Sequence, residues 1–144
     1  MLCVFGPRSV RTIPFCAAAT SRIISAMRSA GSQRLLCLTG AMVGDLPANV
    51  SRAMRVMAAV YRHQHPDLAK DASNQERAVM ASGLLWTLVK PPRLTNGGAP
   101  RQVRADRALP VGLFSRLSRR GLATFMLDEA TEGRHIQERV YVSG

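Results

Sequence analysis

Short apolar runs alternate with stretches of helical periodicity along most of the chain. Leu2–Phe5 is apolar and ends abruptly at Gly6-Pro7, as buried strands of parallel sheets do. Arg34–Thr39 and Leu84–Lys90 are similar runs, and the segment RVYVSG is a fourth. Strands that alternate with helices indicate a layered α/β fold with a parallel sheet. The first two strands and the helix between them should form a βαβ unit with a right-handed crossover.

The helix between the first two strands has clear start and stop signals. Thr12 can cap it, Pro14 is tolerated in its first turn, and Gly31 supplies its C-terminal stop. Its inward positions recur at helical spacing. They are Cys16, Thr20, Ile23, Ile24, Met27 and Ala30.

Three further helices are expected. One stops before Pro66, the next starts near Asp67 or Ser73 and ends at Gly83, and the last is capped by Ser118. Their inward faces carry, in this order, Val50, Met54, Met57, Ala58 and Tyr61, then Val79 and Met80, then Leu122, Phe125 and Met126.

Composition fits a single domain of ordinary globular character. Hydrophobic residues make up 47% of the 144 positions, and a chain of this length can bury a sizeable core. No linker or repeat divides it, although a loop should follow Pro91-Pro92 and include a short hairpin around Gln102–Leu109. No apolar run approaches the ~20 residues that a membrane span needs, so no membrane partner is expected.

The three cysteines, Cys3, Cys16 and Cys37, are odd in number and lie among apolar residues. This pattern is typical of free core thiols in a reducing compartment, so we expect a cytoplasmic protein without a disulfide framework.

The first 44 residues hold five arginines and no acidic residue, as a mitochondrial transit peptide does. They also contain a strand, a helix and a second strand in order, which a transit peptide would not be expected to hold. His63 and His65 point in different directions on a helix, so no metal site is expected.

The net charge of +11 comes almost entirely from arginine, which accounts for 18 of the 20 basic residues. Nucleic-acid binding favours a dense basic stripe with interleaved aromatic residues, yet aromatic residues are only 5% of the chain. The nearest clusters are Arg101, Arg104 and Arg107, and Arg116, Arg119 and Arg120. A nucleic acid is therefore not an expected partner.

Several segments together resemble one group of short-chain dehydrogenases. They are GPRS, TIP, ATSRIISAMRSAGSQRLLCLTGAM, QERAVMASGLLWTLVKPPRLTNG, LPVGLFSRLSRRGLATFMLDE and RVYVSG. This order resembles the atypical short-chain dehydrogenases called NAD(P)H-binding or NmrA-like proteins, and it is similar to their flavin reductase (biliverdin reductase B) branch. The pattern SGLxWTxVxPPRL is the most specific element. The resemblance implies a Rossmann-like sheet and NADP or NAD as the cofactor.

The resemblance covers only the second half of the family's fold. In the family, a βαβαβ half that begins with a G-x-x-G-x-x-G fingerprint precedes a strand like Leu2–Phe5. No such fingerprint occurs in these 144 residues. We therefore expect residues 1–144 to be a partial NAD(P)-binding Rossmann-like domain, truncated at the N-terminus, with weak or absent cofactor binding. The open edge of Leu2–Phe5 predicts self-association.

Three strand ends carry the candidate cofactor-binding residues. Dinucleotides bind across the carboxyl ends of the strands in open α/β sheets. The residues at these ends are Gly6, Pro7 and Arg8 after the first strand, Thr39 and Gly40 after the second, and Pro91, Pro92 and Arg93 after the third. By resemblance, the first end faces the adenosine ribose and pyrophosphate, and the other two flank the nicotinamide ribose and ring.

The catalytic residues stay unassigned. The Tyr-x-x-x-Lys pair of short-chain dehydrogenases is absent, because Tyr61 is followed at the fourth place by His65. Gly40 occupies the position where flavin-reductase-like members tend to carry a serine. Lys70 is expected to be an exposed lysine, and no chemical role is assigned to Glu76.

Two functions remain open. One is an NAD(P)H-dependent oxidoreductase acting on a flavin, quinone or similar small molecule, and the other is an NmrA-like cofactor-sensing regulatory protein without catalysis.

Overall fold

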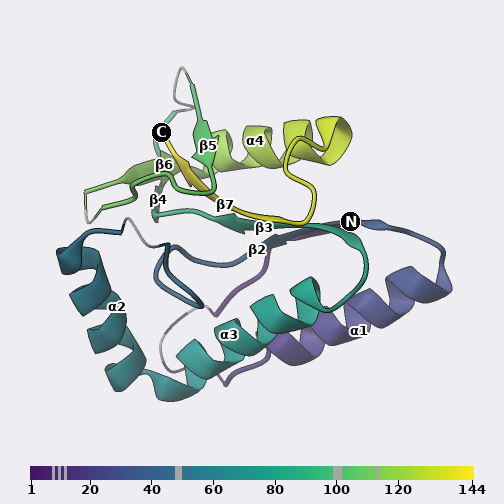
Figure 1. Cartoon of the computed structure of the whole chain (residues 1–144), viewed down its shortest axis with the longest axis horizontal. Helices are drawn as coiled ribbons and strands as arrows, with labels where there is room; N and C mark the ends of the chain where they lie inside the picture. The colour runs from purple at the N-terminus through teal and green to yellow at the C-terminus, as the bar shows by residue number, and fades with distance from the viewer. Residues whose placement is uncertain (8, 10, 12, 48–49, 99–101, 113) are drawn as a thin grey trace.

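A five-stranded, mostly parallel sheet forms the centre of the molecule (Figure 1). The structure, a computed structural model, describes residues 1–7, 9, 11, 13–47, 50–98, 102–112 and 114–144. Its strands are β1 (Leu2–Cys3), β2 (Arg34–Leu38), β3 (Leu85–Lys90), β4 (Arg93–Thr95), β5 (Arg104–Asp106), β6 (Arg116–Ser118) and β7 (Glu138–Ser143). The main sheet has the order β1-β2-β3-β7-β5 with β5 alone antiparallel, and β4 pairs with β6. The expected α/β class is confirmed.

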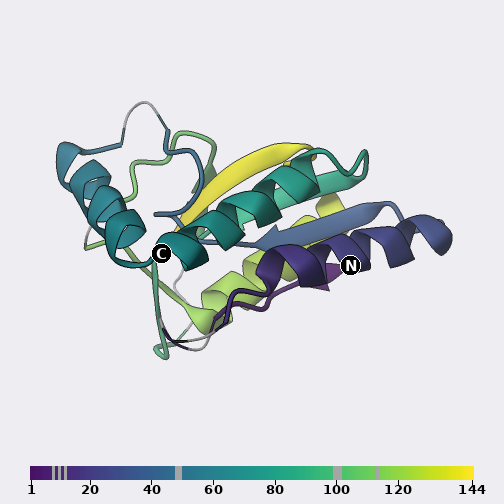
Figure 2. The ribbon, with the colours of Figure 1, turned by 90° about the horizontal axis from the view of Figure 1, so that it is seen from below.

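Helices cover both faces of this sheet. They are α1 (Cys16–Ser29), α2 (Arg52–Gln64), α3 (Pro66–Met80) and α4 (Arg119–Glu132). Helices α1 and α3 lie side by side on one face and α4 on the other, whereas α2 lies beyond the strand ends (Figure 1, Figure 2). Alternate residues of β2 serve the two cores: Leu35 and Cys37 pack with α1 and α3, and Leu36 packs with α4. No helix in the described part of the chain is long and apolar enough to cross a membrane.

Most of the predicted element ends are confirmed. Gly31 and Gly83 follow α1 and α3 with φ of +67° and +69°, the left-handed conformation that ends many helices. Ser118 caps α4, since its side chain accepts a hydrogen bond from the N–H of Gly121 at 3.0 Å. Trp86 of β3 is buried in the core, as its strand pattern predicts.

Three of the details that differ from the prediction concern β1, residues 104–106 and Met57. Strand β1 ends at Cys3 because only its two residues pair with β2, and Val4 is 58% exposed. Residues 104–106 form no hairpin of their own; they pair with β7, which gives the sheet its antiparallel edge. Met57, expected to point inward, is 45% exposed because α2 lies beyond the sheet.

The N-terminus of α1 is capped by a residue of another helix. Phe15 occupies the N-cap position and offers no side-chain acceptor. Instead, the Asp71 carboxylate of α3 accepts hydrogen bonds from the N–H groups of Phe15, Cys16 and Ala17 at 3.1, 2.8 and 3.0 Å. A carboxylate here satisfies N–H groups that a helix leaves unpaired and offsets its positive end. Thr12, the expected cap, lies outside the described residues.

Substitution of Asp71 by asparagine should destabilise the fold. Asn keeps the shape of the side chain but loses the charge that faces the end of α1, so we expect the free energy of unfolding to fall by about 1 kcal/mol. Urea denaturation measures this difference. Asp128→Asn, on the exposed side of α4, is the matched control and should change stability by less than about 0.5 kcal/mol. Equal effects of the two substitutions would contradict the capping role.

The open edge of β1 should promote self-association. On one side β1 pairs with β2, and its other edge has no strand partner among the described residues. An uncovered strand edge beside apolar side chains favours pairing with another chain. We expect light scattering to detect oligomers and Val4→Lys to reduce them. Val56→Lys replaces a similarly exposed valine on α2 and should have no effect. A monodisperse monomer would show that the edge is not adhesive.

Candidate functional site

The carboxyl ends of β1, β2 and β3 meet at one edge of the sheet because these strands run parallel. The segments after β2 and β3 are tied together: the N–H of Thr39 donates to the Val89 carbonyl at 3.0 Å, and the N–H of Ala41 to the Pro91 carbonyl at 3.1 Å. The described residues predicted to bind a cofactor all line cavities at this edge; they are Gly6, Pro7, Thr39, Gly40, Pro91, Pro92 and Arg93. Arg8 lies outside the described residues.

Two adjoining cavities occupy this edge. The larger has a volume of about 610 Å³ and is lined by Thr39, Gly40 and residues 91–94, among others. The smaller, of about 250 Å³, includes residues 4–7 after β1 and also touches Thr39 and Gly40. Leu38, Val43 and Tyr61 line both as well. The fold therefore joins the three strand ends in one composite site.

The larger cavity is mostly apolar, with a few polar groups. Its apolar side chains include Leu38, Met42, Val43, Met54, Met57 and Leu94. Pro91 and Pro92 add a rigid wall, and the exposed Arg93 is the one cation among the described lining residues. Methionine side chains adapt to irregular shapes, and apolar cavities with few polar groups commonly hold flat organic ligands. The cavity is thus suited to a ring system anchored at its edge.

Tyr61 is the lining residue best placed to hold a proton. It contributes to both cavities, and burial raises the pKa of its hydroxyl, which therefore stays protonated at neutral pH. The ring of His65 packs against it edge-on, with 5.3 Å between the ring centroids. Lys70 is exposed, as predicted. No group of three or more metal-ligating side chains that could hold an ion occurs within the described residues.

A buried ion pair lies directly beneath this site. Lys90 and Glu76 have side chains only 0% and 2% exposed, and Nζ of Lys90 lies 2.6 Å from Oε1 of Glu76. The same carboxylate oxygen accepts a hydrogen bond from the Thr39 hydroxyl at 2.9 Å, and Lys90 also donates to the Val43 carbonyl at 2.6 Å. Burial lowers the pKa of Lys90, and the charge of Glu76 opposes that shift.

Sequence reasoning missed this pair. Glu76 lies one helical turn before Val79 on the inward face of α3, and Lys90 ends a strand whose other residues are mostly apolar. Two opposite charges at inward positions of adjacent elements are a signal that they pair, because neither can be buried alone.

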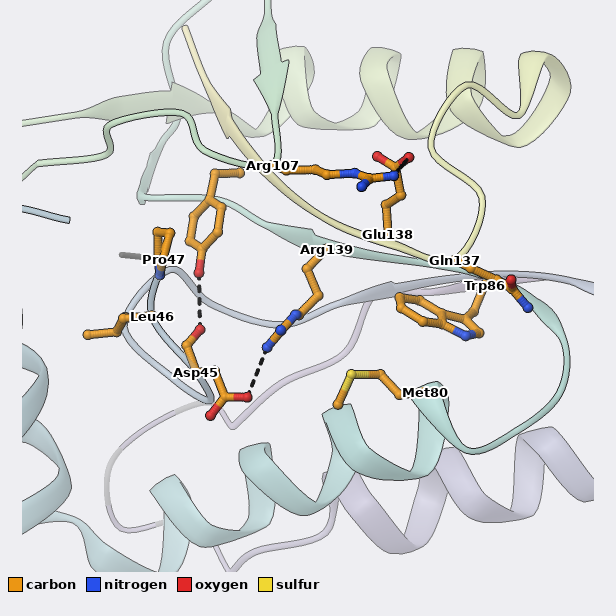
Figure 3. A pocket seen from close by; sticks show the side chains of 10 residues that line it. Asp45, Leu46, Pro47, Met80, Trp86, Arg107, Gln137, Glu138 and Arg139 are labelled. Atoms are coloured by element: carbon orange, nitrogen blue, oxygen red, sulfur yellow. Dashed lines mark hydrogen bonds and ion pairs between the residues drawn. The ribbon is translucent and has the colours of Figure 1, made fainter. Parts of the chain in front are cut away.

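The loop after β2 is held from both sides. Gly44, at a φ of +65°, lies so close to Glu76 that a Cβ atom there would come within 2.1 Å of the carboxylate oxygen Oε2. On the opposite side, the Tyr141 hydroxyl donates to the Asp45 carbonyl at 3.2 Å, and Arg139 pairs with the Asp45 carboxylate at 3.1 Å (Figure 3). Burial raises the pKa of Tyr141 to about 12, and the charge of Glu76 adds to the rise.

Comparison with known proteins identifies the family. A profile of the NAD(P)H-binding family matches residues 2–132. No curated protein matches the chain. Two of the similar solved structures are a Streptococcus pneumoniae protein assigned as an NADH-flavin reductase (TM-score 0.75, 20% identity) and ChuY, an anaerobillin reductase from Escherichia coli (TM-score 0.76, 16% identity). A third is a short-chain dehydrogenase/reductase from Veillonella parvula in complex with NADP (TM-score 0.71, 12% identity).

The chain aligns over most of its own length but only part of theirs. The matches cover 99%, 99% and 89% of this chain and 70%, 62% and 58% of those three structures, in the same order. At these identities the likeness concerns the fold, which is the Rossmann-like arrangement that the sequence predicts. The family profile covers far more than half of the sequence. The chain therefore belongs to the NAD(P)H-binding family.

Proposed function

We propose that this chain forms the nicotinamide side of an NAD(P)H site and serves hydride transfer to a flat conjugated acceptor such as a flavin or a quinone. The observation that carries the proposal is the convergence of three strand ends on two adjoining cavities, the larger of which is mostly apolar with few polar groups. The reductase descriptions of the Streptococcus and Escherichia proteins, and the NADP bound to the Veillonella protein, support it.

The residues present fit the nicotinamide half of the cofactor. A cavity of about 610 Å³ is within the range that holds a small organic ligand, and Gly40 allows close approach of the backbone. The pyrophosphate half lacks its usual partner, since no glycine fingerprint occurs in these 144 residues. We propose accordingly that residues 1–144 act as the carboxyl-terminal part of an NAD(P)-binding domain.

Bound NAD(P)H would supply a hydride from its nicotinamide ring. The apolar side chains around the larger cavity would exclude water from the acceptor, and the wall of Pro91 and Pro92 would limit its orientations. Tyr61 would donate a proton to the reduced acceptor and regain it from solvent. Burial raises the pKa of Tyr61, so its hydroxyl carries a proton at neutral pH but is a weaker acid than a tyrosine whose pKa is lowered by a neighbouring lysine.

The cellular setting remains part of the proposal. Cys3, Cys16 and Cys37 are free and buried, which suits a reducing compartment such as the cytoplasm. A small molecule is the proposed partner, because the larger cavity, of about 610 Å³, is mostly apolar and of a size for a small organic ligand, and because aromatic residues, which nucleic-acid binding favours, are only 5% of the chain.

NADPH should bind the 144-residue protein weakly or not at all, because most phosphate recognition in such folds comes from the glycine loop and its helix. Titration followed by NADPH fluorescence measures the affinity, and a dissociation constant in the low micromolar range would contradict this expectation. Reduction of FMN or menadione at millimolar NADPH then tests the reaction. Binding without turnover would favour the cofactor-sensing alternative.

Arg93→Ala should weaken NADPH binding about tenfold, which corresponds to ~1.4 kcal/mol. A guanidinium at the cavity edge can grip a phosphate or carboxylate through two hydrogen bonds, and alanine cannot. NMR titration measures weak affinities of this kind. Arg120→Ala, on the exposed surface of α4, is the control and should leave binding unchanged. Equal affinities for wild type and Arg93→Ala would make Arg93 an ordinary loop residue.

A further inference from the structure

The buried ion pair of Lys90 and Glu76 forms hydrogen bonds to residues that line the two cavities. Burying two charges is costly, and apolar side chains of similar size often serve stability as well or better. Among the described residues, the two charged side chains form hydrogen bonds, apart from the one with each other, to the Thr39 hydroxyl and the Val43 carbonyl, and Nζ of Lys90 also lies 5.7 Å from the centroid of the Tyr141 ring. Thr39 and Val43 both line the two cavities. The pair is therefore connected to the walls of the site.

The first connection fixes the role of the Thr39 hydroxyl. An ionised carboxylate only accepts hydrogen bonds, so the hydroxyl proton of Thr39 points to Oε1 of Glu76, 2.9 Å away. The Lys90 ammonium donates a hydrogen bond to the same oxygen at 2.6 Å. The lone pairs of the Thr39 oxygen are then left to accept a hydrogen bond from the cavity. A ligand group that meets Thr39 must donate, as a carboxamide NH₂ or a ribose hydroxyl does.

The second connection holds the loop that forms one wall of the larger cavity. Lys90 binds the Val43 carbonyl at 2.6 Å, and the backbone of Gly44 rests on the Glu76 carboxylate with no room for a Cβ atom. Met42 and Val43, whose side chains line the larger cavity, belong to this loop. The position of this loop beside the cavity therefore depends on the ion pair of Lys90 and Glu76.

We infer that Glu76 and Lys90 are positioning residues, which set Thr39 as a hydrogen-bond acceptor toward the ligand and hold residues 41–44 as a wall of the cavity. The inference rests on the proposed function for the identity of the ligand, and its claim about the loop stands independently of any ligand.

The test combines ligand binding with loop exchange. The probe is reduced nicotinamide mononucleotide, which carries the carboxamide and one ribose, and its affinity is measured by NMR titration. Glu76→Gln, which removes the charge and keeps the shape, should weaken binding roughly fivefold to tenfold, the range that one hydrogen bond is worth. In a Thr39→Val background, Glu76→Gln should have little further effect. In a Thr39→Ser background, which keeps a hydroxyl, the effect should return.

Amide hydrogen exchange of Ala41 and Val43 without ligand tests the loop. Exchange should be about tenfold faster in Glu76→Gln and in the double variant Glu76→Gln/Lys90→Met. The double variant removes both buried charges, so it leaves no unpaired charge in the core that would unfold the whole protein. Glu129→Gln is the matched control. Glu129 is 2% exposed and pairs with Arg34 at 2.7 Å, distant from the cavities in the fold, so its loss should change neither probe affinity nor loop exchange.

The outcomes separate the two claims. If loop exchange is unchanged in the double variant, the ion pair does not hold the wall of the cavity. If Glu76→Gln weakens probe binding equally in the Thr39→Val and Thr39→Ser backgrounds, Glu76 does not act through Thr39. If the wild-type protein does not bind the probe at all, the Thr39 claim fails. The exchange experiment alone then decides whether the pair positions the loop.

Discussion

Parallel pairing of β1, β2 and β3 is the constraint on which the rest of this structure depends. Parallel strands need crossover connections, and here the crossovers place α1 and α3 on the same face of the sheet. The same alignment directs three carboxyl ends to one edge, where two cavities adjoin. Without this alignment Gly6, Thr39 and Pro91, which lie far apart in the sequence, would share no site.

The edge needs more than strand alignment to become a defined cavity. The loop after β2 would be free to move if only its own backbone held it, but Lys90 and Glu76 hold it from below, and Tyr141 and Arg139 bind Asp45 from the other side. Each of these contacts joins residues distant in sequence. The wall of the proposed nicotinamide pocket is therefore a product of tertiary packing, and its charged support is buried where water cannot weaken it.

The sequence pattern predicted the features that depend on residues close together in the chain. Apolar runs marked β2 and β3, and glycines that favour positive φ marked the ends of α1 and α3. The common position of Thr39, Gly40 and Pro91 at one cavity could be predicted because the carboxyl ends of parallel strands meet at one edge of the sheet. Long-range contacts could not be predicted in this way. Asp71 caps a helix that begins 55 residues earlier.

The central claim is that the ends of β2 and β3 form the nicotinamide side of a cofactor site. Chemical-shift mapping with increasing reduced nicotinamide mononucleotide, followed in ¹H–¹⁵N spectra of the 144-residue protein, tests it most directly. The account predicts the largest concentration-dependent shifts at the amides of Thr39, Gly40 and Arg93, with saturation at a common millimolar affinity. Figure 3 shows a separate pocket, which Trp86, Glu138 and Arg139 help to line. Shifts centred on that pocket, with the amides of Thr39, Gly40 and Arg93 unmoved, would contradict the claim.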